Sequence, residues 1–222
     1  MSDYQIRIRR SQGTRIYKVA LGERMSALDA LFRIQAEHES ALAFRCACRV
    51  GMCGTCAMSI NGVPRLACKT RVSALDSRVV AIAPLANFPV IQDLVVSLEP
   101  FFEQWRRIKP ALRGSGSDTL AIVPPDPVIS RKRDCITCGI CYAACGVKAS
   151  HADFLGPAAI NRAFLRIHDP RDAAHRDRLK ILNDEWSGVW RCHTQFNCTA
   201  VCPKKIDLTE TIGRLKRTML AS

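Results

Sequence analysis

Residues 135–145 read CITCGICYAAC, and residues 192–203 read CHTQFNCTAVCP. The first run spaces its cysteines as Cys-x2-Cys-x2-Cys-x3-Cys, a spacing typical of sites that ligate iron–sulfur clusters. The second run keeps this spacing and the closing proline, but Gln195 stands where its second cysteine is expected. The first run therefore supplies four thiol ligands, and the second supplies three.

The pairing rule of two-cluster ferredoxins divides these cysteines between two sites. In such proteins the fourth cysteine of each run ligates the cluster of the other run. Four thiolates complete a cubane, so the rule predicts a [4Fe–4S] cluster whose ligands are Cys135, Cys138, Cys141 and Cys202.

The other site combines three cysteines with an amide. Its thiol ligands are Cys145, Cys192 and Cys198, and Gln195 occupies the gap. A neutral amide is a poor iron ligand beside the soft, anionic thiolates that such clusters select. We therefore predict a [3Fe–4S] cluster, which is a cubane that lacks one corner. The alternative is a zinc-structured adaptor, but two closed four-ligand zinc sites would need His193 beside the seven cysteines.

A different cysteine motif lies in the first half of the chain, where residues 45–56 read RCACRVGMCGTC. Gaps of four residues and then two match the plant-type spacing of a [2Fe–2S] cluster. The two glycines allow close wrapping of the backbone, with N–H groups turned toward sulfide. The predicted ligands are Cys48, Cys53, Cys56 and Cys68. Cys46 is left over as a small buried residue or a free thiol, with an exchange for Cys48 as the alternative.

The first hundred residues predict a sheet crossed by one helix. Apolar residues alternate over 4–9 and 15–21, which indicates a hairpin with one buried face. Ser26, followed by Asp29, is expected to cap a helix that packs on the sheet. An Asn-Gly turn at 61–62 predicts a second hairpin. A further strand is expected over 79–82 and a helix over 93–105, and the whole matches a β-grasp fold.

The second half predicts helices. Residues 110–127 contain GSGS and two adjacent prolines without periodicity, so they are expected to form a linker. Helices are expected from Pro157, over 172–183, and after Asp207, which forms a capping pair with Glu210. The predicted fold class is α+β. A β-grasp plant-type [2Fe–2S] domain (1–109) precedes the linker (110–127) and an all-α bacterial-ferredoxin-like domain (128–222).

Composition narrows the function classes further. Twelve cysteines among 222 residues, clustered in tight motifs, favour metal binding over disulfides and hence a reducing compartment. A net charge of +13 without a recognisable motif does not indicate nucleic-acid binding; it suits anionic clusters, an acidic partner or an anionic membrane leaflet. No apolar run of about 18 residues is present, so no transmembrane segment is expected. The alternation from Tyr4 onward speaks against a signal peptide.

The combination of a plant-type motif with two ferredoxin runs that lack one ligand resembles the iron–sulfur subunit of succinate dehydrogenase and fumarate reductase. The resemblance spans essentially the whole chain. The stretches that carry it are CRVGMCGTCAM (48–58), NGVPRLACK (61–69), LANFPVIQDLVV (85–96), CITCGICYAAC (135–145), FLGPAA (154–159) and the second run, residues 192–204.

This resemblance implies a subunit that carries electrons and contains no dicarboxylate site or catalytic residue of its own. Electrons would pass between the FAD of a flavoprotein subunit and quinone through the [2Fe–2S], [4Fe–4S] and [3Fe–4S] clusters in turn. The implied partners are that flavoprotein and membrane-anchor subunits, which bind quinone and in some cases haem b. The implied location is the cytoplasmic face of the bacterial inner membrane, with attachment through the anchors. Service to a different flavin-dependent dehydrogenase is the alternative.

The chain also departs from the pattern of many family members. A proline and a tryptophan pair that lines the quinone pocket follow the first run in those proteins, whereas residues 146–150 read GVKAS here. The resemblance places His193 and Lys216 near quinone. The alternative for His193 is a histidine at the surface or beside a cluster, without a role in quinone binding.

Overall fold

The structure is a computed structural model that describes residues 2–114 and 127–221. It divides into two compact units. The first comprises Met1–Leu98 with Cys138–Ala144, and the second comprises Glu99–Thr137 with Cys145–Ser222. The predicted linker at 110–127 lies largely outside the described residues, and the predicted domain boundaries stay predictions.

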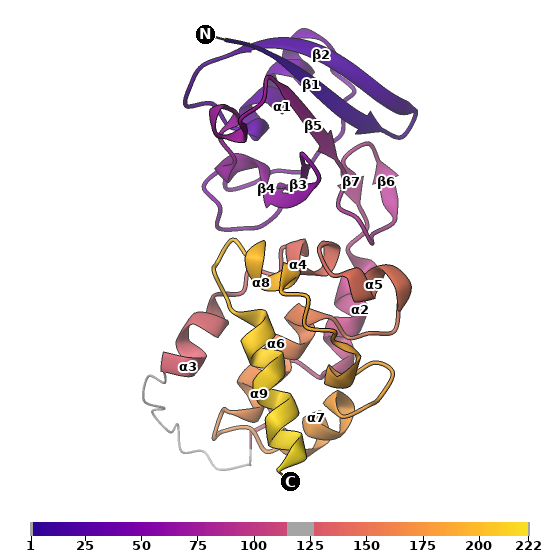
Figure 1. Cartoon of the computed structure of the whole chain (residues 1–222), viewed down its shortest axis with the longest axis vertical. Helices are drawn as coiled ribbons and strands as arrows, with labels where there is room; N and C mark the ends of the chain where they lie inside the picture. The colour runs from indigo at the N-terminus through magenta and orange to yellow at the C-terminus, as the bar shows by residue number, and fades with distance from the viewer. Residues whose placement is uncertain (1, 115–126, 222) are drawn as a thin grey trace. The chain divides into compact units, whose positions relative to one another are not determined.

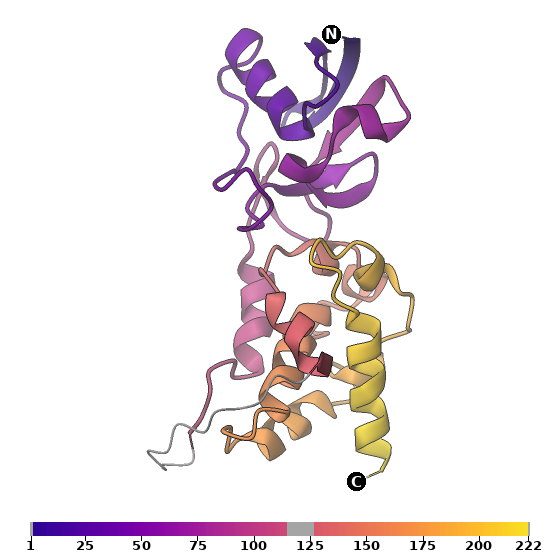
Figure 2. The same ribbon diagram turned by 90° about the vertical axis from the view of Figure 1, so that its left-hand side faces the viewer.

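A five-stranded mixed sheet forms the first unit (Figure 1). Its strands, in spatial order, are β2 (Gly13–Leu21), β1 (Ser2–Arg10), β5 (Val79–Ala83), β3 (Ala57–Ile60) and β4 (Val63–Leu66). β1 and β5 run parallel, and the other neighbouring strands are antiparallel. Helix α1 (Ala27–Glu37) buries Leu28, Leu31 and Ile34 and crosses the sheet (Figure 2). This arrangement confirms the predicted β-grasp fold.

Local signals in the sequence act as expected in this unit. The Ser26 side chain accepts a hydrogen bond from the Asp29 N–H, and the Asp29 carboxylate accepts one from the Ser26 N–H at 2.8 Å. This capping box satisfies two N–H groups that the first helical turn leaves without partners. Asn61 and Gly62 have φ values of 49° and 77°, as a tight hairpin turn between β3 and β4 requires.

The helix predicted over 93–105 is wrong in its first part. A short hairpin of β6 (Val90–Gln92) and β7 (Val95–Val96) comes first, and helix α2 (Glu99–Arg107) begins only at Glu99. Asp93 has a left-handed φ of 46° and is buried. Its carboxylate accepts hydrogen bonds from the Arg10 side chain at 3.1 Å and from the Ala43 N–H at 3.1 Å. These tertiary bonds hold Asp93 out of a helix despite the apolar spacing.

The described part of the second unit contains helices and no strand. Its α-helices are α2, α3 (Pro127–Ser130), α5 (Gly146–Ser150), α6 (Pro157–Ile167), α7 (His175–Leu182), α8 (Asn197–Ala200) and α9 (Leu208–Leu220). Two 3-10 turns, η3 (Arg131–Asp134) and η4 (Val189–Arg191), precede the two cysteine runs. Asp207 caps α9 by accepting a hydrogen bond from the Glu210 N–H at 2.9 Å, as predicted.

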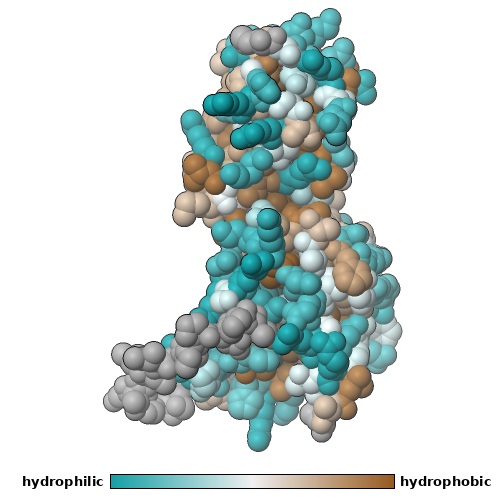
Figure 3. Space-filling view, turned by 60° about the vertical axis from the view of Figure 1, so that its left-hand side comes forward, coloured by the Kyte–Doolittle hydropathy of each residue, from teal (hydrophilic) through white to brown (hydrophobic). Residues whose placement is uncertain are grey.

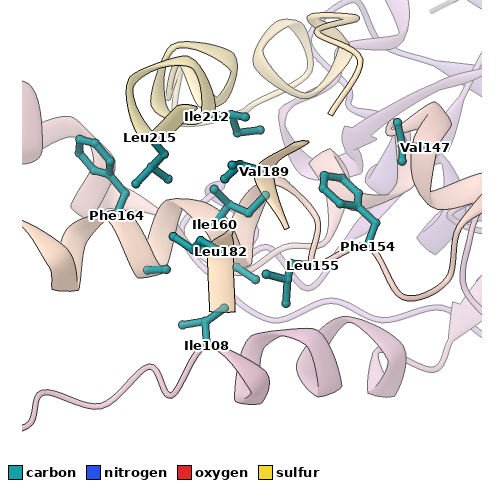
Figure 4. Close-up of a cluster of buried hydrophobic side chains, with 12 residues drawn as sticks. Ile108, Val147, Phe154, Leu155, Ile160, Phe164, Leu182, Val189, Ile212 and Leu215 are labelled. Carbon is teal, nitrogen blue, oxygen red and sulfur yellow. The ribbon is translucent and has the colours of Figure 1, made fainter. Parts of the chain in front are cut away.

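One apolar core, drawn in Figure 4, joins α5, α6, α7 and α9 with η4 and with the residue that follows α2. Its buried members are Ile108, Val147, Phe154, Leu155, Ala159, Ile160, Ala163, Phe164, Leu182, Val189, Ile212 and Leu215. Cys145 and Cys192 pack against this core and are only partly buried. The core therefore supports two of the cysteines predicted to ligate the three-iron cluster.

A buried ion pair fixes the segment between α6 and α7. Arg178 and Asp172 pair with fully buried side chains, and Arg178 also donates to the Lys109 and Ala111 carbonyls at 2.9 and 2.7 Å. The Asp172 carboxylate accepts from the Ala174 N–H at 2.8 Å. Because Asp172 is used in this way, α7 begins at His175 rather than at the predicted residue 172.

Hydrophilic side chains predominate on the face of the molecule drawn in Figure 3. Across the described ranges 2–114 and 127–221, no helix combines the length and apolar character needed to span a bilayer.

Candidate iron–sulfur sites

The loop over residues 48–56 turns its backbone donors toward sulfur. The Cys48 Sγ accepts hydrogen bonds from the Met52 N–H at 3.2 Å and from the Cys53 N–H at 3.3 Å. The Thr55 N–H points at the Cys53 Sγ at 3.5 Å. Such donors stabilise a thiolate, the form of cysteine that binds iron. The loop is therefore prepared for anionic sulfur ligands.

The four cysteines predicted for the [2Fe–2S] cluster lie together in the first unit. Backbone hydrogen bonds from Val50 and Cys53 lower the pKa of Cys48 to about 6. Burial, together with a hydrogen bond to Cys56, raises the pKa of Cys68 to about 12, and the Cys48 charge acts in the same direction. These interactions indicate that the Cys68 thiol lies near those of Cys56 and Cys48. Four thiols, with backbone N–H donors at Cys48, Cys53 and Cys68, fit an iron–sulfur cluster, whose iron would bind them as thiolates.

The same loop approaches Cys138 within the first unit. Gly54 has a φ of +76°, and a Cβ placed on it would lie 2.6 Å from the Cys138 Cβ and 3.0 Å from its Cα. Only a residue without a side chain permits this contact. The backbone of one cluster motif therefore touches a predicted ligand of another.

Helix α4 (Ile140–Ala143), which carries Cys141, is attached to the first unit by specific contacts. The Phe88 and Tyr142 rings stack with centroids 4.7 Å apart. The Asn87 amide donates to the Tyr142 and Ala143 carbonyls at 3.2 and 3.1 Å. These contacts hold the segment with Cys138 and Cys141 beside the sheet.

The remaining predicted [4Fe–4S] ligands, Cys135 and Cys202, belong to the second unit. Burial raises the pKa of Cys135; the Thr137 N–H opposes this shift, whereas the Cys202 charge adds to it. The Ile206 N–H points at the Cys202 Sγ at 3.4 Å. Both sulfur atoms thus have backbone donors of the kind that support a cluster-bound thiolate.

A single hollow in the second unit brings together the residues predicted for the three-iron site. Cys145, Cys192, Cys198, His193 and Gln195 all line it. Burial raises the pKa values of Cys145 and Cys198, and the negative charge of Cys192 raises both further. N–H groups of Val147, Lys148 and Thr194 point at these sulfur atoms. The hollow therefore fits a cluster with three thiolate ligands.

Gln195 packs against the chain next to Cys145. A Cβ on Gly146 would lie 2.7 Å from the Gln195 Oε1 atom, so glycine at this position leaves room for the amide. The residues on both sides of Gln195, Thr194 and Phe196, have left-handed φ values of 57° and 60°. Non-glycine residues rarely adopt such values, which here turn the loop around the hollow.

The two residues that the resemblance places near quinone both lie beside Cys192. His193 lines the hollow. The Lys216 ammonium donates a hydrogen bond to the Cys192 carbonyl at 2.9 Å and lies 6.0 Å from the centre of the Trp190 ring. The structure thus brings these residues to the predicted three-iron site, and their role toward quinone stays a prediction.

Sequence reasoning missed two contributors to these sites. Thr209 lies with its hydroxyl 3.7 Å from the Cys198 Sγ, and Lys148 acts electrostatically on Cys145. No sequence motif marks either residue, because each is brought near its cysteine only by the fold. Within the described residues, no three His, Cys, Asp or Glu side chains are grouped so as to hold a single metal ion.

Comparisons with known proteins agree with this geometry. Residues 4–103 match the family described as a 2Fe-2S iron-sulfur cluster binding domain, and residues 132–206 match a 4Fe-4S dicluster domain. The chain is 38% identical over 216 residues to the fumarate reductase iron-sulfur subunit of Haemophilus influenzae, covering 90% of this chain and 84% of that protein. This chain belongs to the succinate dehydrogenase and fumarate reductase iron–sulfur subunits.

Further relatives support the assignment of this iron–sulfur subunit. The mitochondrial succinate dehydrogenase [ubiquinone] iron-sulfur subunit 2 of rice (Oryza sativa subsp. japonica) is 38% identical over 196 residues, which cover 85% of this chain and 63% of that protein. A chain of the Mycobacterium smegmatis Sdh1 complex in the apo form superposes with a TM-score of 0.88 at 30% identity. The match covers 99% of this chain and 96% of that one.

The predicted fold class and general function are confirmed. The chain is an electron-transfer subunit of a multi-subunit succinate dehydrogenase or fumarate reductase complex, and it acts through iron–sulfur clusters. This family membership sets aside the zinc-structured adaptor, whose sites would hold no redox-active metal.

Proposed function

We propose that this subunit relays electrons between the FAD of a flavoprotein subunit and a quinone in the membrane. The proposed ligand sets are Cys48, Cys53, Cys56 and Cys68 for [2Fe–2S]; Cys135, Cys138, Cys141 and Cys202 for [4Fe–4S]; and Cys145, Cys192 and Cys198 for [3Fe–4S]. Each cluster, when bound, accepts one electron and passes it on. The cysteine side chains and backbone N–H groups hold and tune the clusters.

One observation carries the proposal: three thiols and the Gln195 amide line the same hollow. This is the donor set of a cluster with an open corner, and it distinguishes a three-cluster relay from an ordinary two-cluster ferredoxin. The contact between Gly54 and Cys138 adds support at the other end of the relay. It brings the backbone of the proposed [2Fe–2S] loop against a proposed [4Fe–4S] ligand, and short separations favour electron transfer.

The proposed partners follow from the complexes to which the relatives belong. A flavoprotein subunit would exchange electrons with the [2Fe–2S] end, and anchor subunits that bind quinone, with or without haem b, would meet the [3Fe–4S] end near His193 and Lys216. We place the subunit on the cytoplasmic face of a bacterial inner membrane. Its net charge of +13 suits the anionic surface of that leaflet.

Low-temperature EPR of the isolated complex tests the proposal. The air-oxidised complex is expected to give a nearly isotropic three-iron signal, and dithionite reduction should add a [2Fe–2S] signal. The variant Gln195→Cys supplies a fourth thiolate, so the oxidised signal should diminish and a reduced [4Fe–4S] signal should grow.

Gln195→Leu serves as the matched control, because it alters the same position without adding a ligand. It should retain the three-iron signal. An oxidised wild-type complex without that signal would contradict the proposed ligand set of the terminal cluster.

A further inference from the structure

Lys148 is a buried lysine on the short helix α5, three residues after Cys145. Its residue surface is only 5% exposed. Its ammonium group donates hydrogen bonds to the main-chain carbonyls of Ala152 and Phe154, the latter at 2.8 Å. Lysine is among the residues least often buried, because removing its charge from water is costly. The cost of burying this charge suggests that Lys148 has a function that offsets it.

The surroundings of Lys148 connect it to the three-iron site. Its neighbour Val147 and its hydrogen-bond partner Phe154 line the same hollow as Cys145, and both belong to the core drawn in Figure 4. The Lys148 N–H also points at the Cys145 sulfur. The hydrogen bond to Phe154 thus ties the ammonium group to a residue that lines this hollow.

The charge of Lys148 interacts electrostatically with Cys145. Burial lowers the pKa of Lys148 to about 8, and the Cys145 thiolate opposes that decrease. The Lys148 ammonium is therefore close enough to Cys145 to interact with its charge. In surroundings of low polarity, such a charge acts more strongly than it would in water.

We propose that the Lys148 ammonium raises the reduction potential of the cluster held by Cys145, Cys192 and Cys198. Reduction adds one electron, supplied by the preceding cluster of the relay, and hence one negative charge. A fixed positive charge beside a ligand favours the reduced form without forming or breaking a bond. This inference rests on the proposed function, because it requires a cluster in that hollow.

A redox titration of the isolated complex, followed by the three-iron EPR signal, tests the role of Lys148. Lys148→Met and Lys148→Gln remove the charge and keep a long side chain. Each is expected to shift the ratio of reduced to oxidised cluster at a given potential at least tenfold toward the oxidised form. For one electron this is a decrease of ~59 mV in the midpoint potential. The [2Fe–2S] midpoint should stay unchanged.

Two further variants separate charge from packing. Lys180→Met removes an exposed lysine of α7 in the same unit and should leave the three-iron midpoint at the wild-type value. Lys148→Arg retains the positive charge and should lie closer to wild type than Lys148→Met does.

Three results would overturn the assignment of Lys148. The first is a wild-type midpoint in Lys148→Met and Lys148→Gln. The second is loss of the three-iron signal in both while the [2Fe–2S] signal remains, which would indicate a purely structural role. The third is an equal decrease in Lys148→Arg and Lys148→Met. Absence of the signal from the wild-type complex would instead contradict the proposed cluster itself, so the two failures are distinguishable.

Discussion

At the scale of single residues, the proposed cluster sites depend on two glycines, whose lack of a side chain leaves room for close contacts. Gly54 leaves room for Cys138, and Gly146 leaves room for the Gln195 amide. The cysteines could be assigned from spacing because ligand spacing is local and repeats among cluster proteins. The importance of these two glycines could not be predicted from the sequence, because it arises from contacts with residues about 50 to 84 positions away along the chain.

Gly54→Ala is expected to impair the [2Fe–2S] site. A left-handed φ costs a residue with a Cβ roughly 1–2 kcal/mol, and the new methyl group would also overlap Cys138. The reduced [2Fe–2S] EPR signal per protein should fall strongly. Gly62→Ala is the matched control, because its φ of +77° imposes the same strain while nothing lies within 4 Å. Equal loss of signal in both variants would show that backbone strain, rather than the Cys138 contact, is responsible.

At the scale of elements, caps and turns followed the sequence, whereas tertiary hydrogen bonds overrode it at two helix starts. The caps at Ser26 and Asp207 and the turn at Asn61 involve only residues that are near one another in the sequence. Their roles can therefore be predicted from the local sequence. The carboxylates of Asp93 and Asp172 instead bind tertiary partners, among them Arg10 and Arg178. Apolar periodicity does not record such partners, and both predicted helices were consequently too long at their N-terminal ends.

Arg178→Met should strongly destabilise the second unit. The substitution leaves the buried Asp172 carboxylate without its cation and frees the Lys109 and Ala111 carbonyls. Breaking a buried ion pair from one side costs about 3–5 kcal/mol. The thermal midpoint of the isolated complex should therefore fall by several degrees. Arg176→Met, at an exposed position of the same helix, should change the midpoint little; similar decreases in both variants would refute the assigned role of the pair.

At the scale of the whole molecule, carboxylates with cationic or N–H partners occur in both units. Hydrogen bonds from the Arg171 side chain lower the pKa of Asp169 to about 2. Those from Ser187 lower the pKa of Asp184. The pKa of Asp93 is also lowered, because its bonds from Arg10, Ala43 and Ser11 outweigh the opposing effect of burial. Ionised carboxylates thus contribute to the stability of both units.

These shifts predict a loss of stability on the acid side. The folded-state pKa of Asp169 lies below the ordinary value near 4. Its contribution is therefore complete above that pH and disappears as the pH falls through about 2. Asp169→Asn should lower the thermal midpoint at neutral pH and reduce its dependence on pH between about 4 and 2. The exposed Asp177→Asn is the control. An Asp169→Asn curve parallel to wild type would contradict this account.

The sequence by itself determined the number and type of the proposed clusters, the fold of each half and the family, because ligand spacing and apolar periodicity are properties of neighbouring residues. Only the tertiary structure decided that Gly54 contacts Cys138, that Gln195 packs against Gly146 and that the Lys148 side chain is buried. These features depend on packing between distant segments. Burial strongly alters the energy of a charged side chain, and burial depends on the fold rather than on neighbouring residues.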